Sequence, residues 1–407
     1  MTRTSRLLIL AAGVCAGAAA LSAQQARYDD VVRNLRNPDA KTRLSAVRLL
    51  RDSKYPEAVG PMAALVTDPL DEIQLEAIAA ELSFFLVDDV RTRKRVALLV
   101  EVRNPGIAPA AYELGPLAVW PRPVPPELIK GLLQAVDDDN PKVRLEAIYA
   151  LGTIARAPVA AEPAAQLVKA LDHYDPAIRT AAARVIGRLE VRSAGDALIT
   201  AMNDSQAPVR TAAMRALGAI REPRAIQALT ERFNHYGKGE EAWAALDALA
   251  RIGDPSSVPL FKGRLADRDA FMRRAAAEGL ARSGDTTELA ALEVGAGNDT
   301  SDMVRAAMVF ALQKLGKSYI PRLVEFLGSA KMAPQAAEYV AELGPSVTPL
   351  LLPSLQDPSP AIRANVALVL GALGGQNTAA ALQPLTQDPD RDVAQAATRA
   401  IERIKMQ

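Results

Sequence analysis

The residue types that most often carry catalysis or bind metals are scarce in this chain. It has two histidines, His173 and His235, and a single cysteine, Cys15, among 407 residues. A catalytic zinc or iron centre needs several His, Cys, Asp or Glu ligands brought together. Neither histidine has an acidic residue at the spacing of a helical metal motif. We therefore expect no metal site and no cofactor.

Other catalytic patterns are also missing from the sequence. There is no Gly-rich phosphate loop and no G-x-S-x-G turn of a serine hydrolase. The acidic run 137–139 could bind a cation, but its place before an expected helix favours capping and solvation. We predict that the chain has no catalytic residues and is not an enzyme.

The first 23 residues have the pattern of a secretory signal peptide. Arg3 and Arg6 precede an apolar stretch, and cleavage is expected near Ala23. The stretch is shorter than the roughly 20 residues of a membrane-spanning helix, although an uncleaved anchor is the alternative. Cleavage would leave 46 basic and 47 acidic residues and no cysteine. A nearly neutral, exported chain does not fit a nucleic-acid binder.

An apolar residue followed by arginine recurs along most of the chain. Successive arginines are separated by 35, 31, 63, 32 and 58 residues, so the longer steps each contain a degenerate copy. The arginines of this series are Arg144, Arg179, Arg210, Arg273, Arg305 and Arg363.

Each copy continues in one register that only a helix satisfies. Alanine follows the apolar residue by four positions and an aliphatic residue follows it by eight, as in Ala182 and Ile186 after Ile178. This spacing marks one face of an α-helix. Asp or Asn before proline, as in Asn140-Pro141 and Asp175-Pro176, marks the start of such helices, and Ser359-Pro360 is expected to act in the same way.

A single helix pair of this kind cannot bury its apolar face, whereas a stack of pairs can. We predict an all-α fold, an α-solenoid of about twelve stacked antiparallel helix pairs. The expected divisions are a signal peptide at 1–23, N-terminal repeats at 24–87, a proline-rich insertion at 88–127 and the main array at 128–407. The insertion either joins the two arrays, with Trp120 filling an apolar gap, or lines a binding groove with Trp120 and Tyr112.

The repeats resemble the HEAT family, and in particular the short HEAT-like repeats of phycobilin lyases. The residues that carry this resemblance run from Leu171-Asp172 through Asp175-Pro176 and Ile178-Arg179 to Ile186-Gly187. The resemblance covers most of the chain after the signal. It implies a solenoid fold, but such repeats serve many unrelated functions.

The repeated arginines have a structural interpretation. Each follows an acidic or amide residue of the preceding turn by four to six positions, which suggests a ladder of charge-assisted bonds between neighbouring units. The expected members of this ladder are Asp139, Arg144, Asp175, Arg179, Arg210, Asp269, Arg273, Arg305 and Arg363.

A second set of residues lies on the helix face opposite the core. Second helices of HEAT repeats generally line the concave wall, so this face would form a mildly basic groove. Its expected members are Tyr149, Arg184, Arg188, Arg215, Arg274, Arg282, Phe310 and Lys314, continued by Arg399 and Arg403. An acidic or extended protein segment would be the natural partner.

The sequence thus predicts a monomeric, non-enzymatic interaction scaffold of the periplasm or cell exterior. An enzyme of the phycobilin-lyase type and a structural spacer without a dedicated site are the alternatives.

Overall fold

The computed structural model describes residues 27–87, 119–155 and 161–406, and in these ranges the chain forms eleven antiparallel helix pairs. The first pair consists of helical residues 27–34 and α2 (Ala40–Asp52). The signal peptide expected at 1–23 and most of the expected insertion lie outside the described residues. None of the described helices is long and apolar enough to cross a bilayer.

The longer helices alternate with shorter ones, several of which are completed by a 3-10 turn. The helices are α2 (Ala40–Asp52), α3 (Val59–Met62), α4 (Asp71–Phe85), α7 (Pro126–Ala135), α8 (Pro141–Ile154), α9 (Ala161–Lys169), α10 (Pro176–Arg188), α11 (Gly195–Ala201), α12 (Ala207–Ala219), α13 (Ile226–Tyr236), α14 (Glu240–Ile252), α15 (Val258–Arg264), α16 (Ala270–Ser283), α17 (Leu289–Asn298), α18 (Asp302–Lys314), α19 (Ile320–Leu327), α20 (Ala333–Leu343), α21 (Thr348–Leu351), α22 (Pro360–Leu373), α23 (Gln376–Leu382) and α24 (Arg391–Lys405).

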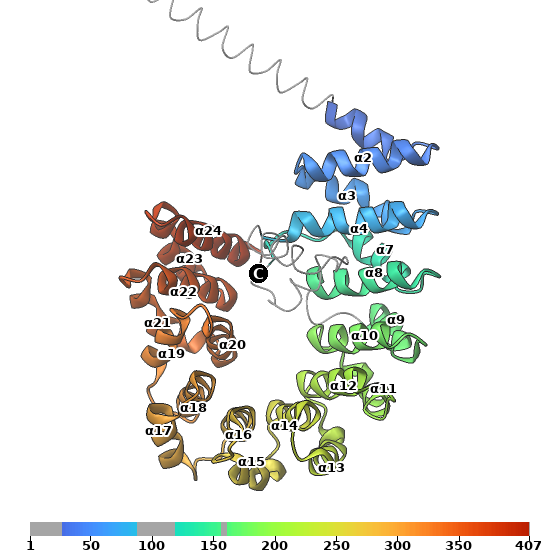
Figure 1. Ribbon diagram of the computed structural model, residues 1–407. Coiled ribbons are helices and arrows are strands. Elements are labelled where there is room, and N and C mark those ends of the chain that lie inside the picture. Colours follow the sequence, from blue (N-terminus) through green and yellow to red (C-terminus); the bar gives the residue numbers. More distant parts are fainter. Residues whose placement is uncertain (1–26, 88–118, 156–160, 407) are drawn as a thin grey trace, which may run out of the picture.

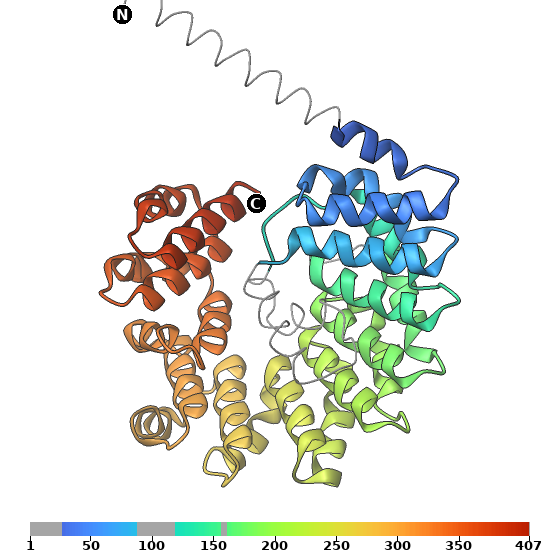
Figure 2. The same cartoon turned by 45° about the horizontal axis from the view of Figure 1, so that its top comes forward.

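The pairs stack into a curved, horseshoe-shaped solenoid (Figure 1). The second helix of each pair, such as α10, α12, α14 and α16, lies on the concave side, and the first helix lies outside. The predicted all-α solenoid is confirmed. Figure 2 shows the last repeats, in red, and the first repeats, in blue, on opposite sides of the opening.

The core follows the predicted helical register. The aliphatic residues at the eighth position of the second helices are buried, among them Ile186, Leu217 and Leu280. Glycine lets the inner helices approach closely: a Cβ added at Gly187 would lie 2.9 Å from the Cα of Ala216. At Gly218 the corresponding distance to the Cα of Ala248 is 2.6 Å.

Most of the predicted helix starts have the expected cap. The side chains of Asn140, Asp175, Asp269 and Asp390 each accept a hydrogen bond from a backbone amide of the first turn. Ser359 occupies the cap position of α22, but its side chain makes no such bond, so that prediction was wrong.

The arginine ladder exists with different acidic partners from those predicted. The Arg179 guanidinium forms a fork with Asp204, at 2.7 and 2.9 Å, and also donates to the carbonyls of His173 and Tyr174. Asp204 belongs to the next turn of the stack. Equivalent forks join Arg43 to Asp68, Arg273 to Asp299 and Arg363 to Asp388, while Arg210 pairs with Glu241 at 2.6 Å.

The acidic residues predicted as ladder partners serve other purposes. Asp175 caps α10, and Asp269 caps α16 and accepts a bond from the indole of Trp243. They do not pair with the following arginine because their oxygens already accept from the first helical turn, whereas that arginine reaches forward to the next repeat. Asp139 likewise does not pair with Arg144, which donates to the carbonyl of Asp138 and lies 3.9 Å from Asp137. Arg305 donates to the Asp299 carbonyl and pairs with Asp302 of its own helix.

We expect Arg179→Ala to lower the free energy of unfolding by about 2–3 kcal/mol, because it leaves Asp204 half-buried without its partner. The hydrogen bond from Arg179 holds the pKa of Asp204 below its usual value. This stabilisation is therefore present above the unfolded carboxyl pKa, near 4, and is lost as the pH falls through the lower folded pKa. Denaturant titration at pH 7 and pH 3 measures both effects. Arg322→Ala, at an exposed pair on α19, is the control and should change stability by less than about 1 kcal/mol; equal losses in the two variants would refute the ladder.

Residues on either side of the undescribed stretch 88–118 reach across the opening of the horseshoe. Leu86 and Val119 form an antiparallel bridge, and the Trp120 amide donates to the Phe85 carbonyl. In α24, Arg403 donates to the Val119 carbonyl at 3.4 Å, and the Arg399 guanidinium lies 5.7 Å from the centre of the Trp120 ring. The last repeat therefore contacts the N-terminal part of the array.

These contacts bear on the two roles considered for the insertion. Trp120 is half-buried against the apolar core and lies beneath an arginine, in agreement with the gap-filling interpretation. Tyr112 lies outside the described residues.

Glu81 in α4 breaks the apolar pattern of the core. It stands eight residues after Ile73, at the position that other repeats fill with leucine or isoleucine. The side chain is buried, and neither carboxyl oxygen has a hydrogen-bond partner among the described residues. Burial raises the pKa of Glu81 well above its usual value. Glu81 is therefore a destabilising polar residue within the core.

Replacing Glu81 by leucine should raise the free energy of unfolding by about 1–3 kcal/mol at neutral pH, because a buried polar group without a partner is removed. Since the folded-state pKa of Glu81 is raised, the natural chain loses stability as pH rises above about 4 until that folded pKa is passed. The advantage of the leucine variant should thus grow with pH in denaturant titrations. Glu72→Leu, at an exposed site of the same helix, should show no such trend; a destabilised Glu81→Leu would contradict the prediction.

Candidate functional site

A large open cleft lies within the curve of the solenoid. Its volume is about 1240 Å³, and its walls come from the inner helices α10, α12, α14, α16 and α20. Pockets for drug-sized ligands are usually about 300–1000 Å³. The cleft is therefore large enough for a segment of another chain.

The first wall of the cleft is basic. Arg184 and Arg188 come from α10 and Arg215 from α12, and Arg184 and Arg215 are exposed. Within the described ranges Arg184 makes no ion pair, and Arg215 lies 3.4 Å from an exposed Glu240. Four of the eight residues predicted for the concave face, these three and Arg282, line the cleft.

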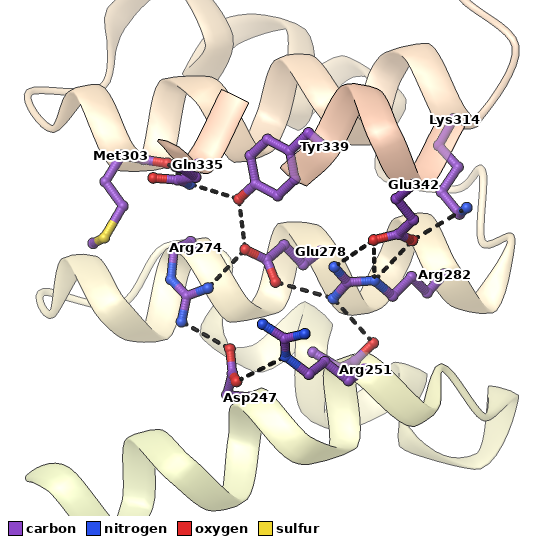
Figure 3. Close-up of polar contacts among 11 residues, drawn as sticks. Asp247, Arg251, Arg274, Glu278, Arg282, Met303, Lys314, Gln335, Tyr339 and Glu342 are labelled. Atoms are coloured by element: carbon purple, nitrogen blue, oxygen red, sulfur yellow. Dashed lines mark hydrogen bonds and ion pairs between the residues drawn. The ribbon is translucent and has the colours of Figure 1, made fainter. Parts of the chain in front are cut away.

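The floor of the cleft contains a network of charged side chains from α14 and α16 (Figure 3). Asp247 accepts a hydrogen bond from Arg274 at 2.8 Å and one from Arg251 at 3.3 Å. Burial by itself would raise the pKa of Asp247, but the two arginines hold it well below its usual value. Asp247 is therefore a fixed carboxylate at neutral pH.

Glu278 and Arg282 of α16 connect this floor to the opposite wall. Glu278 is 2% exposed and accepts from Arg274 at 2.7 Å and from Arg282 at 3.0 Å. Arg282 in turn forms a fork with Glu342 of α20, whose other neighbour is Lys314 at 3.3 Å. The network thus joins helices that are 60 residues apart in sequence.

An aromatic pair completes the network. Tyr339 of α20 stacks on Phe310 of α18 with ring centres 4.4 Å apart, and its hydroxyl donates to Glu278 at 2.5 Å. The amide of Gln335 donates to the same hydroxyl at 2.6 Å. Burial and the adjacent Glu278 carboxylate raise the pKa of Tyr339 well above its usual value, so the hydroxyl remains a hydrogen-bond donor.

The prediction that Phe310 is an exposed contact point was wrong, because α20 packs over the inner face of α18 and buries it completely. Arg274 and Arg282, predicted as part of a basic surface row, are mostly buried in ion pairs for the same reason. Lys314 pairs with Glu342, and Tyr149 is half-buried outside the cleft. The groove is therefore shorter than the predicted row and lies mainly on α10 and α12.

Sequence reasoning missed the acidic half of this site. Asp247, Glu338 and Glu342 all line the cleft. Asp247 and Glu342 belong to the two degenerate repeats, where the register is hard to assign. Buried arginines imply nearby carboxylates, but the burial of Arg274 and Arg282 is seen only in the structure.

The described residues contain no group of three or more His, Cys, Asp or Glu side chains placed to hold a metal ion. The chemistry that the cleft offers is ion pairing and hydrogen bonding: exposed guanidinium groups on α10 and α12, carboxylates on α20 and at the start of α14, and a fixed network beneath.

Comparisons with known proteins agree with this architecture. Residues 164–238, 237–313 and 320–402 match the HEAT repeats family, and residues 128–157 match a single HEAT repeat. The chain belongs to the HEAT-repeat family. No curated protein sequence matches the chain.

Several solved structures are similar to the chain at low sequence identity. The complex of CpcE and CpcF of phycocyanin lyase from Nostoc sp. is 18% identical, covers 59% of this chain and 94% of its own, and has a TM-score of 0.42. Human deoxyhypusine hydroxylase is 20% identical over 69% of this chain and 96% of its own, with a TM-score of 0.29. Kap121p is 15% identical over 93% of this chain and 45% of its own, with a TM-score of 0.35.

Proposed function

We propose that this protein is a non-enzymatic scaffold of the cell envelope that binds a segment of a partner protein in its concave cleft. The observation that carries this proposal is the open cleft of about 1240 Å³, walled by exposed arginines of α10 and α12. A groove of this size with charged, solvent-accessible walls suits a charged peptide segment, since electrostatic complementarity guides association. Export to the periplasm or cell exterior is proposed from the signal pattern at residues 1–23.

The charge of the first wall specifies the partner more closely. Arg184 forms no ion pair with any described residue, and Arg215 has only a long, exposed contact with Glu240, so both guanidinium groups are accessible to the carboxylates of a partner. An acidic segment of the partner would therefore lie along α10 and α12. A nucleic acid is a poorer fit, because Glu240, Glu241 and Glu338 also line the cleft and would repel phosphates.

Reversing both charges with Arg184→Glu and Arg215→Glu should abolish partner binding. We expect at least a tenfold loss of captured partner when the mature chain is used as bait on its own cell-envelope extract, with mass spectrometry as readout. Both side chains are exposed, so the fold should be retained, which circular dichroism checks.

The matched control is Arg322→Glu together with Arg268→Glu, two exposed arginines that do not line the cleft. Partners lost with the cleft variant and kept with this control support the proposal. Undiminished capture by the cleft variant would refute it, and would favour a structural spacer.

A further inference from the structure

The exposed side chains on the two walls of the cleft differ in charge. This difference indicates which partner segment would bind there. The α10–α12 wall presents Arg184 and Arg215, and α20, which faces it across the interior in Figure 1, presents Glu338 and Glu342. Glu342 is already paired with Arg282 and Lys314. Glu338 is exposed and forms no ion pair with any described residue.

The surroundings of Glu338 favour a positive charge beside it. The Glu338 carboxyl group is accessible from the cleft but is partly desolvated by the surrounding protein, and this desolvation raises its pKa; Arg251 lowers it, and the carboxylates of Glu278 and Asp247 raise it. A carboxyl group that lies among other carboxylates binds a cation more readily than an isolated one does. Arg274 and Arg282 are held by Asp247, Glu278 and Glu342, and Arg251 is paired with Asp247. Arg251 attracts Glu338 electrostatically but forms no ion pair with it among the described residues.

We infer that Glu338 forms a separate subsite for a basic side chain, so that the cleft selects a partner segment carrying both acidic residues and a lysine or arginine. The acidic residues of that segment pair with Arg184 and Arg215 on the first wall. The basic side chain of the segment extends across the floor of the cleft and pairs with Glu338 on the second wall. This inference rests on the proposed binding of a protein segment in the cleft.

The charges that line the cleft make a uniformly acidic segment a poorer fit than a mixed one. A purely acidic segment long enough to fill the cleft would bring carboxylates against Glu338, and like charges in contact are unfavourable. Because the cleft carries both signs of charge, it would attract a segment of mixed charge and repel a purely acidic one.

Fluorescence anisotropy with synthetic twelve-residue peptides tests the inference on the purified chain lacking residues 1–23. One probe is acidic along its first half and has two lysines in its second half; the other has alanines in place of the lysines. We expect the mixed probe to bind roughly fivefold to tenfold more tightly, and Glu338→Gln to remove this difference while leaving the lysine-free probe unaffected or slightly tighter.

The outcomes separate the inference from the proposal on which it rests. Equal affinity of both probes for the natural chain, with loss of both in the Arg184→Glu, Arg215→Glu variant, would overturn the Glu338 subsite alone. Binding of neither probe would overturn peptide binding in the cleft and the subsite together. Glu325→Gln, at an exposed carboxylate on the outer helix α19, is the matched control and should change neither affinity.

Discussion

Replacing Glu278 by alanine should destabilise the C-terminal half of the solenoid by about 3–5 kcal/mol. Glu278 is the carboxylate shared by Arg274, Arg282 and the Tyr339 hydroxyl. Its removal leaves the buried Arg274 and Arg282 with one carboxylate each, Asp247 and Glu342, in place of two, and it leaves the buried hydroxyl of Tyr339 without an acceptor. The loss of a buried charged partner is among the most costly single changes in a protein core.

The measurement should resolve regions of the chain, because repeat arrays do not always unfold as one unit. Hydrogen exchange followed by mass spectrometry would show whether α16, α18 and α20 lose protection. Glu325→Ala, which breaks an exposed pair on α19, is the control and should cost less than about 1 kcal/mol. Unchanged protection of α16 and α20 in the Glu278→Ala variant would contradict a stabilising role for the network.

The second large effect is expected at Gly218 in α12. A Cβ there would lie 2.6 Å from the Cα and 3.1 Å from the Cβ of Ala248, so α12 and α14 would have to separate. We expect Gly218→Ala to lower the free energy of unfolding by about 2–3 kcal/mol, despite the helix-favouring effect of alanine. The larger Gly218→Val should prevent close packing altogether and widen the cleft.

Gly263 in α15 offers a matched control, because nothing lies within 4 Å of a Cβ placed there. Gly263→Ala should stabilise the chain slightly, by about 0.5–1 kcal/mol, since only the helix preference of alanine remains. Denaturant unfolding should show that glycine-to-alanine lowers the free energy of unfolding at Gly218 and raises it at Gly263. This result would establish close helix contact as the cause. A stabilised Gly218→Ala would refute it.

The fold was predictable from local patterns, because each repeat encodes its own helices. The spacing seen in Ile178, Ala182 and Ile186 defines one apolar face, and Asp175-Pro176 defines the start of the helix. These signals depend on residues within one turn or two of each other, and they recur often enough to be recognised in a single sequence.

The acidic partners of the ladder arginines could have been found from their constant spacing in the sequence. Asp68, Asp204 and Asp388 each follow their arginine by 25 residues. Each also accepts the amide two residues further on, so one aspartate shapes its own turn and holds the previous repeat. The prediction paired the arginines with the nearest acids in sequence, whereas the contact lies between neighbouring repeats.

By itself, the sequence determined the class of helix, its register, most of its caps and the existence of an arginine-based ladder. The tertiary structure alone decided which inner-face residues remain accessible. Phe310, Arg274 and Arg282 satisfy the same surface pattern as Arg184 and Arg215, yet α20 covers the first three and leaves the other two exposed. The reason is that curvature arises from small rotations accumulated over many repeats, and no local pattern specifies which distant helices then come into contact.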